Sequence, residues 1–117
     1  MSLKKERYGI IVERAEDWEM TPDGLCRTTR AFLIRRRLCC GKRCGNCPYV
    51  NWCMDQNWEP LPAEYIRRVR GSRRSVAGAW ALSAHHQAEL AHASQSDYVY
   101  HQEMVRYYYQ LLESWDR

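Results

Sequence analysis

The chain has 117 residues and a formal net charge of +4, and its length fits one compact domain or a small module with helices attached. No run of eighteen apolar residues occurs, which excludes a membrane-spanning helix. The charge is uneven: residues 1–23 sum to −2, residues 24–54 to +7 without a single acid, residues 55–75 to +2 and residues 76–117 to −3. A concentrated positive charge attracts phosphate or acidic partners, and the alternative is a basic face that only keeps the chain soluble.

The beginning of the chain predicts short strands. The run YGIIV at residues 8–12 has β-type composition. MTPDGL at residues 20–25 is typical of a turn, because Pro22 fixes one backbone angle and Asp23 and Gly24 close the turn. We therefore expect a short N-terminal β-hairpin around this turn.

A helix is predicted over residues 28–38, TTRAFLIRRRL. Thr28 or Thr29 can cap its first turn, and its apolar residues share one side. Arginines in its last turn suit the negative end of the helix dipole. Because this helix leads directly into Cys39, its arginines either contact phosphate beside the cysteines or pair with the acidic N-terminal segment.

Residues 38–54, LCCGKRCGNCPYVNWCM, contain five of the six cysteines: Cys39, Cys40, Cys44, Cys47 and Cys53. Their spacing follows neither helix nor strand period, so a loop folded around a metal ion or cluster explains it better than core packing. No apolar segment of signal-peptide length precedes them, and we expect reduced thiols in the cytoplasm or the mitochondrial matrix rather than disulfides. The sixth cysteine, Cys26, is either a remote ligand or an inert buried thiol.

The cysteine spacing leaves the metal open. Cys39-x4-Cys44-x2-Cys47 matches a plant-type ferredoxin interval, and Cys47 followed by proline occurs in many iron–sulfur motifs. Zinc sites more often show two separated pairs, and here only Cys44-x2-Cys47 has that spacing. A 4Fe–4S cluster and a tetrahedral zinc ion each take four thiolates, so at least one cysteine is spare. We favour an iron–sulfur cluster, with Zn²⁺ as the alternative.

The segment Met20–Tyr49 resembles a small cysteine-rich family of unknown function. The shared pattern is a Pro-acidic-Gly turn, a Thr-led segment that ends in basic residues, and Cys-Cys-x3-Cys-x2-Cys-Pro followed by an aromatic residue. The resemblance implies that Cys39, Cys40, Cys44 and Cys47 act together. It implies no activity.

The spacing of Cys44, Cys47 and Cys53 is also similar to the iron–sulfur motifs of RecB-type nucleases and of auxiliary-cluster domains in radical enzymes. The paired acids and lysine of the nuclease are missing, and the chain is too short for the barrel of the radical enzymes. Only the ligand positions carry over from this similarity, and they favour iron–sulfur over zinc.

Three more helices are predicted, over residues 62–70, 75–93 and 97–115. The last two form either an antiparallel hairpin or one long bent rod. Because a short hairpin has little core of its own, we expect the apolar stripe of the last helix to dock a protein partner. The residues of this stripe are Tyr98, Val105, Tyr108, Leu112 and Trp115.

One other group of polar residues is a candidate for chemistry. His85, Glu89 and His92 share a helical stripe, and Glu-x2-His is half of the motif of di-iron helical bundles. A complete site needs carboxylates from more helices, so solvated polar residues are the better interpretation. No catalytic triad, phosphate-binding glycine loop or poised pair of acids is found, and we predict no enzymatic activity.

Together these features predict a mainly α fold, with a small irregular cysteine-rich metal-binding module at residues 1–59 and a helical arm at residues 60–117. The predicted function is a non-enzymatic, metal-stabilised subunit or adaptor of a larger RNA-containing assembly, such as a mitochondrial or bacterial ribonucleoprotein. An iron–sulfur electron carrier or an accessory subunit of a redox complex is the alternative. The predicted phosphate-contacting residues are Arg27, Arg30, Arg35, Arg36, Arg37, Lys42, Arg43, Arg67, Arg68, Arg70, Arg73 and Arg74.

Overall fold

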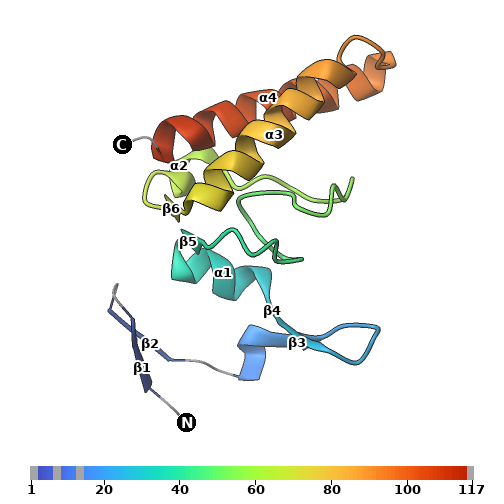
Figure 1. Ribbon diagram of the computed structural model, residues 1–117. Coiled ribbons are helices and arrows are strands. Elements are labelled where there is room, and N and C mark those ends of the chain that lie inside the picture. The colour runs from blue at the N-terminus through green and yellow to red at the C-terminus, as the bar shows by residue number, and fades with distance from the viewer. Residues whose placement is uncertain (1–2, 7–8, 13–14, 116–117) are drawn as a thin grey trace.

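The computed structural model describes residues 3–6, 9–12 and 15–115, with side chains from residue 16 onward. Its helices are α1 (Arg30–Arg36), α2 (Ala63–Ile66), α3 (Arg73–Glu89) and α4 (Gln95–Trp115), with a short 3-10 helix η1 (Ala15–Asp17). Its strands are β1 (Leu3–Glu6), β2 (Gly9–Val12), β3 (Trp18–Met20), β4 (Cys26–Thr28), β5 (Leu38–Cys39) and β6 (Arg70–Gly71). The predicted mainly α fold with an irregular cysteine-rich region and a short N-terminal hairpin is confirmed (Figure 1).

Two antiparallel strand pairs form the N-terminal part. β1 pairs with β2, and β3 pairs with β4 with Trp18 opposite Thr28. The predicted turn joins β3 to β4: the Thr21 N–H donates to the Leu25 carbonyl at 2.7 Å, and Gly24 has a φ of +85°. Tyr8, which begins the predicted β-type run, lies outside the described residues.

Local sequence determines where α1 begins and ends. Thr29 caps the helix, because its side chain accepts a hydrogen bond of 3.3 Å from the Phe32 N–H. Arg37 ends it in the left-handed conformation, with a φ of 58°. Arg35 donates to the carboxylate of Asp17 at 2.8 Å. Of the two predicted alternatives for the arginines of this helix, phosphate contact or pairing with the acidic N-terminal segment, Arg35 therefore shows the second.

α3 and α4 pack against each other as an antiparallel hairpin (Figure 1). α3 begins at Arg73, two residues before the predicted start, because the Ser72 hydroxyl caps it by accepting from the Ser75 N–H at 3.2 Å. Residues 90–94 leave the helix to make the turn into α4. No helix in the described part of the chain combines the length and the apolar character that crossing a bilayer requires.

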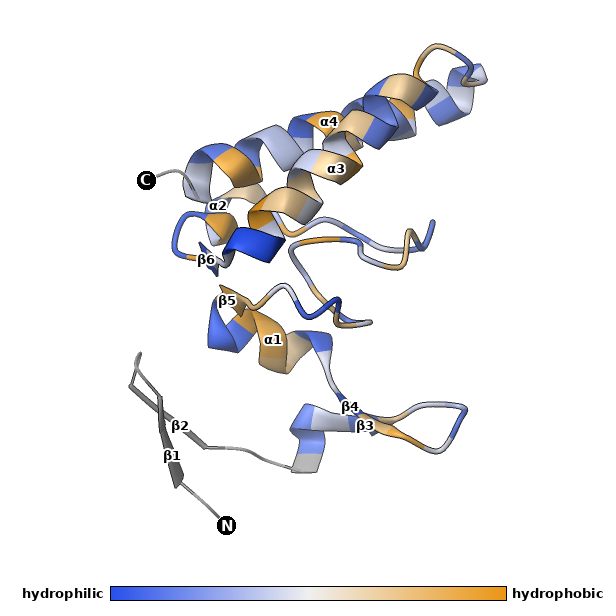
Figure 2. Cartoon of the chain, viewed as in Figure 1, coloured by the Kyte–Doolittle hydropathy of each residue, from blue (hydrophilic) through white to orange (hydrophobic). Residues whose placement is uncertain are grey.

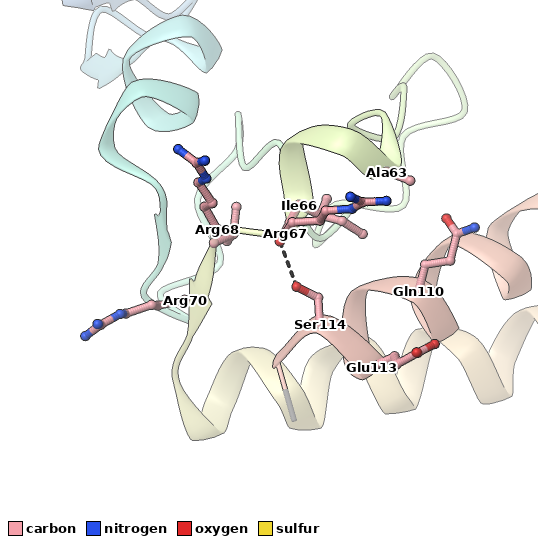
Figure 3. A pocket seen from close by; sticks show the side chains of 9 residues that line it. Ala63, Ile66, Arg67, Arg68, Arg70, Gln110, Glu113 and Ser114 are labelled. Atoms are coloured by element: carbon pink, nitrogen blue, oxygen red, sulfur yellow. Dashed lines mark hydrogen bonds between the residues drawn. The ribbon is translucent and has the colours of Figure 1, made fainter. Parts of the chain in front are cut away.

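α2 is shorter than the helix predicted over residues 62–70. The chain leaves the helix after Ile66, and Arg70–Gly71 pairs in parallel with Leu38–Cys39 as β6 with β5. The end of α2 is held by Ser114 of α4, whose hydroxyl donates to the Ile66 carbonyl at 2.8 Å (Figure 3). Residues 66–71 therefore contact the end of α4 at Ile66 and the start of the cysteine-rich region at β6.

One hydrophobic core joins the cysteine-rich residues to the helical hairpin. It contains buried Cys39, Cys47 and Tyr49 together with Tyr107 and Tyr108 of α4. The Tyr107 hydroxyl donates to the Tyr49 carbonyl at 2.8 Å. The parts predicted at residues 1–59 and 60–117 thus share a core.

The stripe predicted to dock a partner is mostly internal. Tyr108 has no exposed surface and Leu112 is 7% exposed, while Trp115 packs on Gly71. Tyr98, at 44% exposure, lies near the start of α4 on the surface. The prediction that Tyr108 and Leu112 contact a partner is wrong, because α4 buries its aromatic side against the chain's own cysteine-rich residues and α3.

Candidate functional site

The cysteine loop, residues 38–54, is attached to the start of α3. The Cys39 carbonyl accepts two hydrogen bonds, from the Ser72 N–H at 3.1 Å and from the Ser75 hydroxyl at 2.8 Å. Farther along the loop, the Trp58 indole N–H donates to the Cys47 carbonyl at 2.8 Å. These backbone contacts fix both ends of the Cys39–Cys47 segment.

Gly41 permits the close approach of the loop to α3. Its φ of +74° is strained for a residue with a side chain, and a Cβ here would lie 2.6 Å from the Cβ of Arg74 and 2.7 Å from the Ser72 hydroxyl. Figure 2 shows the hydrophilic first turn of α3 close to β6, with hydrophobic residues in α1 and β5. The loop is therefore packed against a helix terminus rather than suspended in solvent.

Four cysteines line one small cavity. Cys39, Cys40, Cys44 and Cys47 surround a volume of about 10 Å³. The sulfur atoms of Cys39 and Cys47 are 3.6 Å apart, and the guanidinium of Arg36 lies 3.9 Å from the Cys40 sulfur. Within the residues that the structure describes, no three or more His, Cys, Asp and Glu side chains lie close enough together to hold a metal ion as they stand. The thiols share a cavity but do not all converge on one point.

The thiols in this cavity have altered acidity. When the Cys47 thiol donates to Cys39, the hydrogen bond lowers the pKa of Cys39, and the same contact together with burial raises the pKa of Cys47. Burial, followed by the charge of Cys40, raises the pKa of Cys44. The contact between Cys39 and Cys47 therefore favours ionisation of the Cys39 thiol over that of the Cys47 thiol.

The other two predicted ligands lie elsewhere. Cys53 is exposed and is not among the residues that line the cavity, so the Cys44, Cys47 and Cys53 triplet is not brought together. Cys26 in β4 is also exposed, and the interpretation of Cys26 as a buried thiol is wrong. The four cysteines that do share the cavity are those grouped by the family resemblance.

The basic residues divide according to their contacts. Four arginines interact within the chain: Arg27 with Glu19 at 3.2 Å, Arg30 with the Glu59 carbonyl at 2.7 Å, Arg35 with Asp17, and Arg36 with Cys40. Another group is exposed, and its side chains make no hydrogen bond or ion pair with the described residues: Arg37, Lys42, Arg43, Arg67, Arg68, Arg73 and Arg74. Arg70 is exposed as well. The second group can meet an external anion at lower cost, because no internal side-chain contact has to break.

A groove of about 490 Å³ lies between α1 and α2 and gathers part of this second group. Arg35 and Arg37 line it from the end of α1, and Arg67 and Arg68 line it from the end of α2. Tyr65, which is 57% exposed, lines the same groove. The other residues along it are Ile34, Tyr49, Leu61 and Glu64.

A second hollow of about 810 Å³ lies on the other side of the same segment, against α4 (Figure 3). Arg67, Arg68 and Arg70 line it, with Glu113 and Gln110 opposite them on α4. The three guanidinium groups point in different directions in Figure 3. One carboxylate lines each of the two, Glu113 here and Glu64 in the groove between α1 and α2, but only that groove also has an exposed aromatic ring, Tyr65, beside its arginines.

The predicted polar stripe of α3 does not form a site, and a different histidine faces inward. His92 is exposed, whereas His86 is 4% exposed and its Nδ1 lies 2.8 Å from Nδ1 of His101 on α4. Burial, and then the proximity of His101, lower the pKa of His86 to about 4. The signal in the sequence was the adjacent pair His85–His86, in which the second member has the spacing of the buried Ala79 and Ser83.

Comparison with known proteins finds one family and no individual relative. No curated protein and no solved structure matches the chain. Residues 11–52 match the model of a family of unknown function, DUF5522. This match contains the whole segment Met20–Tyr49, including the four cysteines that line the cavity. The predicted resemblance to a small cysteine-rich family of unknown function is therefore confirmed, for residues 11–52 of this chain.

Proposed function

We propose that the protein is a non-enzymatic, metal-stabilised adaptor or subunit of an RNA-containing assembly in a reducing compartment. Its metal ion is held by Cys39, Cys40, Cys44 and Cys47. The observation that carries the proposal is that these four thiols line one atom-sized cavity. Four thiolates leave no open coordination position on a tetrahedral ion, which is the arrangement of structural rather than catalytic zinc.

Distance and volume favour a single ion over a cluster. Thiolates about 2.3 Å from a tetrahedral ion are about 3.8 Å from one another, and the Cys39 and Cys47 sulfurs are 3.6 Å apart. In a 4Fe–4S cluster each thiolate binds a different iron, so the four sulfurs are spread more widely. The cavity of about 10 Å³ is also at the lower limit of the space that a single water molecule needs. We therefore propose Zn²⁺ in place of the iron–sulfur cluster that the cysteine spacing favours.

The surroundings of the cavity suit thiolates. Arg36 brings a positive charge to Cys40, and its Nε is buried without a hydrogen-bond partner in the described part of the chain. A neighbouring cation stabilises a thiolate, and a bound metal ion displaces the remaining thiol protons. Metal binding is thus expected to contribute directly to the stability of the loop.

The same loop connects two basic segments. Cys39 lies in β5, and β5 pairs with β6, so the Arg70 N–H donates to the Arg37 carbonyl at 3.2 Å. A metal-fixed loop would hold the arginines that follow α1 beside those that follow α2. Exposed arginines gathered in this way support a contact with RNA phosphates, whose affinity must fall as salt concentration rises.

Elemental analysis of protein purified without oxygen tests the metal. We expect one zinc per chain in the natural sequence. The double substitution Cys39→Ser/Cys47→Ser should abolish metal binding and lower the midpoint of thermal unfolding. The matched control Cys26→Ser/Cys53→Ser also replaces two thiols, but both are exposed and outside the cavity, so it should keep the metal.

Two outcomes would contradict this assignment. Iron together with acid-labile sulfide would replace the zinc ion by an iron–sulfur cluster and support the redox alternative. Folded protein with neither metal and with all thiols free would overturn the metal-stabilised module altogether.

A further inference from the structure

We propose that the groove between α1 and α2 is the binding site for a single-stranded nucleic acid. Its phosphates would contact Arg37, Arg67 and Arg68, and one base would stack on Tyr65. The inference rests on the proposed function, because it assigns the place and the form in which the nucleic acid binds.

The charge of the groove comes from segments that only the tertiary structure brings together. Arg37 follows α1, and Arg67 and Arg68 follow α2, with the β5–β6 pair between them. Arg35 adds little, because Asp17 already pairs with it at 2.8 Å. One carboxylate, Glu64, lines the groove. Three guanidinium groups that make no ion pair with the described residues, against one carboxylate, leave a net positive site, and guanidinium binds phosphate in a bidentate manner.

Tyr65 adds a flat surface beside these charges. It is 57% exposed and lines the groove together with the apolar residues Ile34 and Leu61. An exposed aromatic ring next to cations is the arrangement on which single-stranded nucleic acids stack their bases. The volume of about 490 Å³ is in the range of sites for nucleotide-sized groups.

The ring also distinguishes the occupant. An acidic protein segment would satisfy the arginines but would make no use of the face of Tyr65. In a duplex the faces of the bases are covered by their neighbours, so only an unpaired strand can present a base to the ring. Single-stranded nucleic acid is therefore the ligand that uses both the charge and the aromatic surface.

Fluorescence anisotropy tests the role of the ring, with metal-loaded full-length protein and a labelled RNA of about 12 nucleotides. Tyr65→Ala should weaken binding roughly 5- to 150-fold, the loss expected for one stacked base. Tyr65→Phe, which keeps the ring, should bind like the natural protein. Tyr98→Ala removes another exposed tyrosine, one that does not line the groove, and should have no effect.

Titrations at several salt concentrations test the arginines. Arg67→Gln/Arg68→Gln should weaken binding and reduce the slope of log affinity against log salt by about 0.7 for each phosphate that the variant no longer neutralises. Arg106→Gln is the control, because Arg106 is exposed on α4 and lines neither the groove between α1 and α2 nor the hollow against α4. Equal losses of affinity in Arg106→Gln and in the groove variants would show a nonspecific charge effect and overturn the site.

The ligand class is tested with three further probes: DNA of the same sequence, the RNA duplex and polyglutamate. Weaker binding of the duplex supports the proposal, and the single-stranded DNA shows whether the sugar matters. Binding of polyglutamate that equals that of RNA and ignores Tyr65→Ala would assign the groove to an acidic protein instead. Protein that contains zinc but does not bind RNA refutes this inference alone, whereas Tyr65-dependent RNA binding without any bound metal refutes only the metal-stabilised module.

Discussion

Replacing each of three consecutive tyrosines on α4 by phenylalanine removes one hydroxyl at a time and tests how α4 is joined to the cysteine loop. Tyr108 accepts a hydrogen bond of 3.1 Å from the N–H of Asn51, which is itself 4% exposed. Tyr107 donates to the Tyr49 carbonyl at 2.8 Å. Tyr109 accepts from the Gln87 side-chain amide on the surface.

The three substitutions should differ in cost because they leave different groups unpaired. Tyr108→Phe leaves a buried N–H without a partner and should lower the free energy of unfolding by about 1–3 kcal/mol. Tyr107→Phe removes a donor from a carbonyl, a group that tolerates the loss better than an N–H does, and should cost about 0.5–1.5 kcal/mol. Tyr109→Phe exposes Gln87 to water and should cost less than about 0.5 kcal/mol.

Urea denaturation followed by circular dichroism measures the series, with metal content held constant because a ligand of the folded state shifts its stability. For a chain of this size, 1 kcal/mol corresponds to a change of about 4 °C in the thermal midpoint. A cost for Tyr108→Phe equal to that for Tyr109→Phe would refute the contact between α4 and the cysteine loop.

Two further predictions concern packing and protonation. Gly41→Ala and Gly24→Ala both impose backbone strain of about 1–2 kcal/mol, but only the Gly41 variant also collides with Arg74. In urea denaturation, Gly41→Ala should therefore lower the free energy of unfolding by about 1–3 kcal/mol more than Gly24→Ala does. Equal losses in the two variants would contradict the packing of the loop on α3. Since the pKa of His86 is about 4 in the folded protein and about 6.5 when unfolded, stability is full above pH 6.5 and falls by up to about 3 kcal/mol as the pH drops to 4. Denaturation at several pH values should show that His86→Gln removes this part of the pH dependence. The control His92→Gln, at an exposed position, should leave it in place. An unchanged pH profile in His86→Gln would refute the lowered pKa of His86 as the cause.

The sequence predicted those elements whose signals are local. Thr29 as a helix cap, the turn around Gly24 and the two long C-terminal helices all depend on residues within a few positions of one another, and the structure contains them. The helix predicted over residues 62–70 was too long, because its last residue, Arg70, pairs with β5, more than thirty residues earlier in the chain. Strand pairing over such a separation leaves no periodic pattern.

The aromatic stripe of α4 shows the same limit. Its helical spacing marked one apolar side correctly, but the spacing does not say which surface covers that side. The covering surface includes the chain's own cysteine loop, through contacts such as Tyr108 with Asn51. Likewise, the spacing of His85, Glu89 and His92 marked a polar stripe that is better interpreted as solvated, but it gave no sign that the next residue, His86, lies in the interior beside His101.

By itself, the sequence determined the grouping of the cysteines, the excess of positive charge around them and the amphipathic helices, because composition and short-range spacing encode each of these. Only the tertiary structure separated Cys39, Cys40, Cys44 and Cys47 from Cys26 and Cys53, and only it placed Arg37 beside Arg67 and Arg68. Both outcomes depend on contacts between distant segments, chiefly β5 with β6 and the loop with α3 and α4. Their energies come from burial and hydrogen bonds that do not exist until the chain has folded.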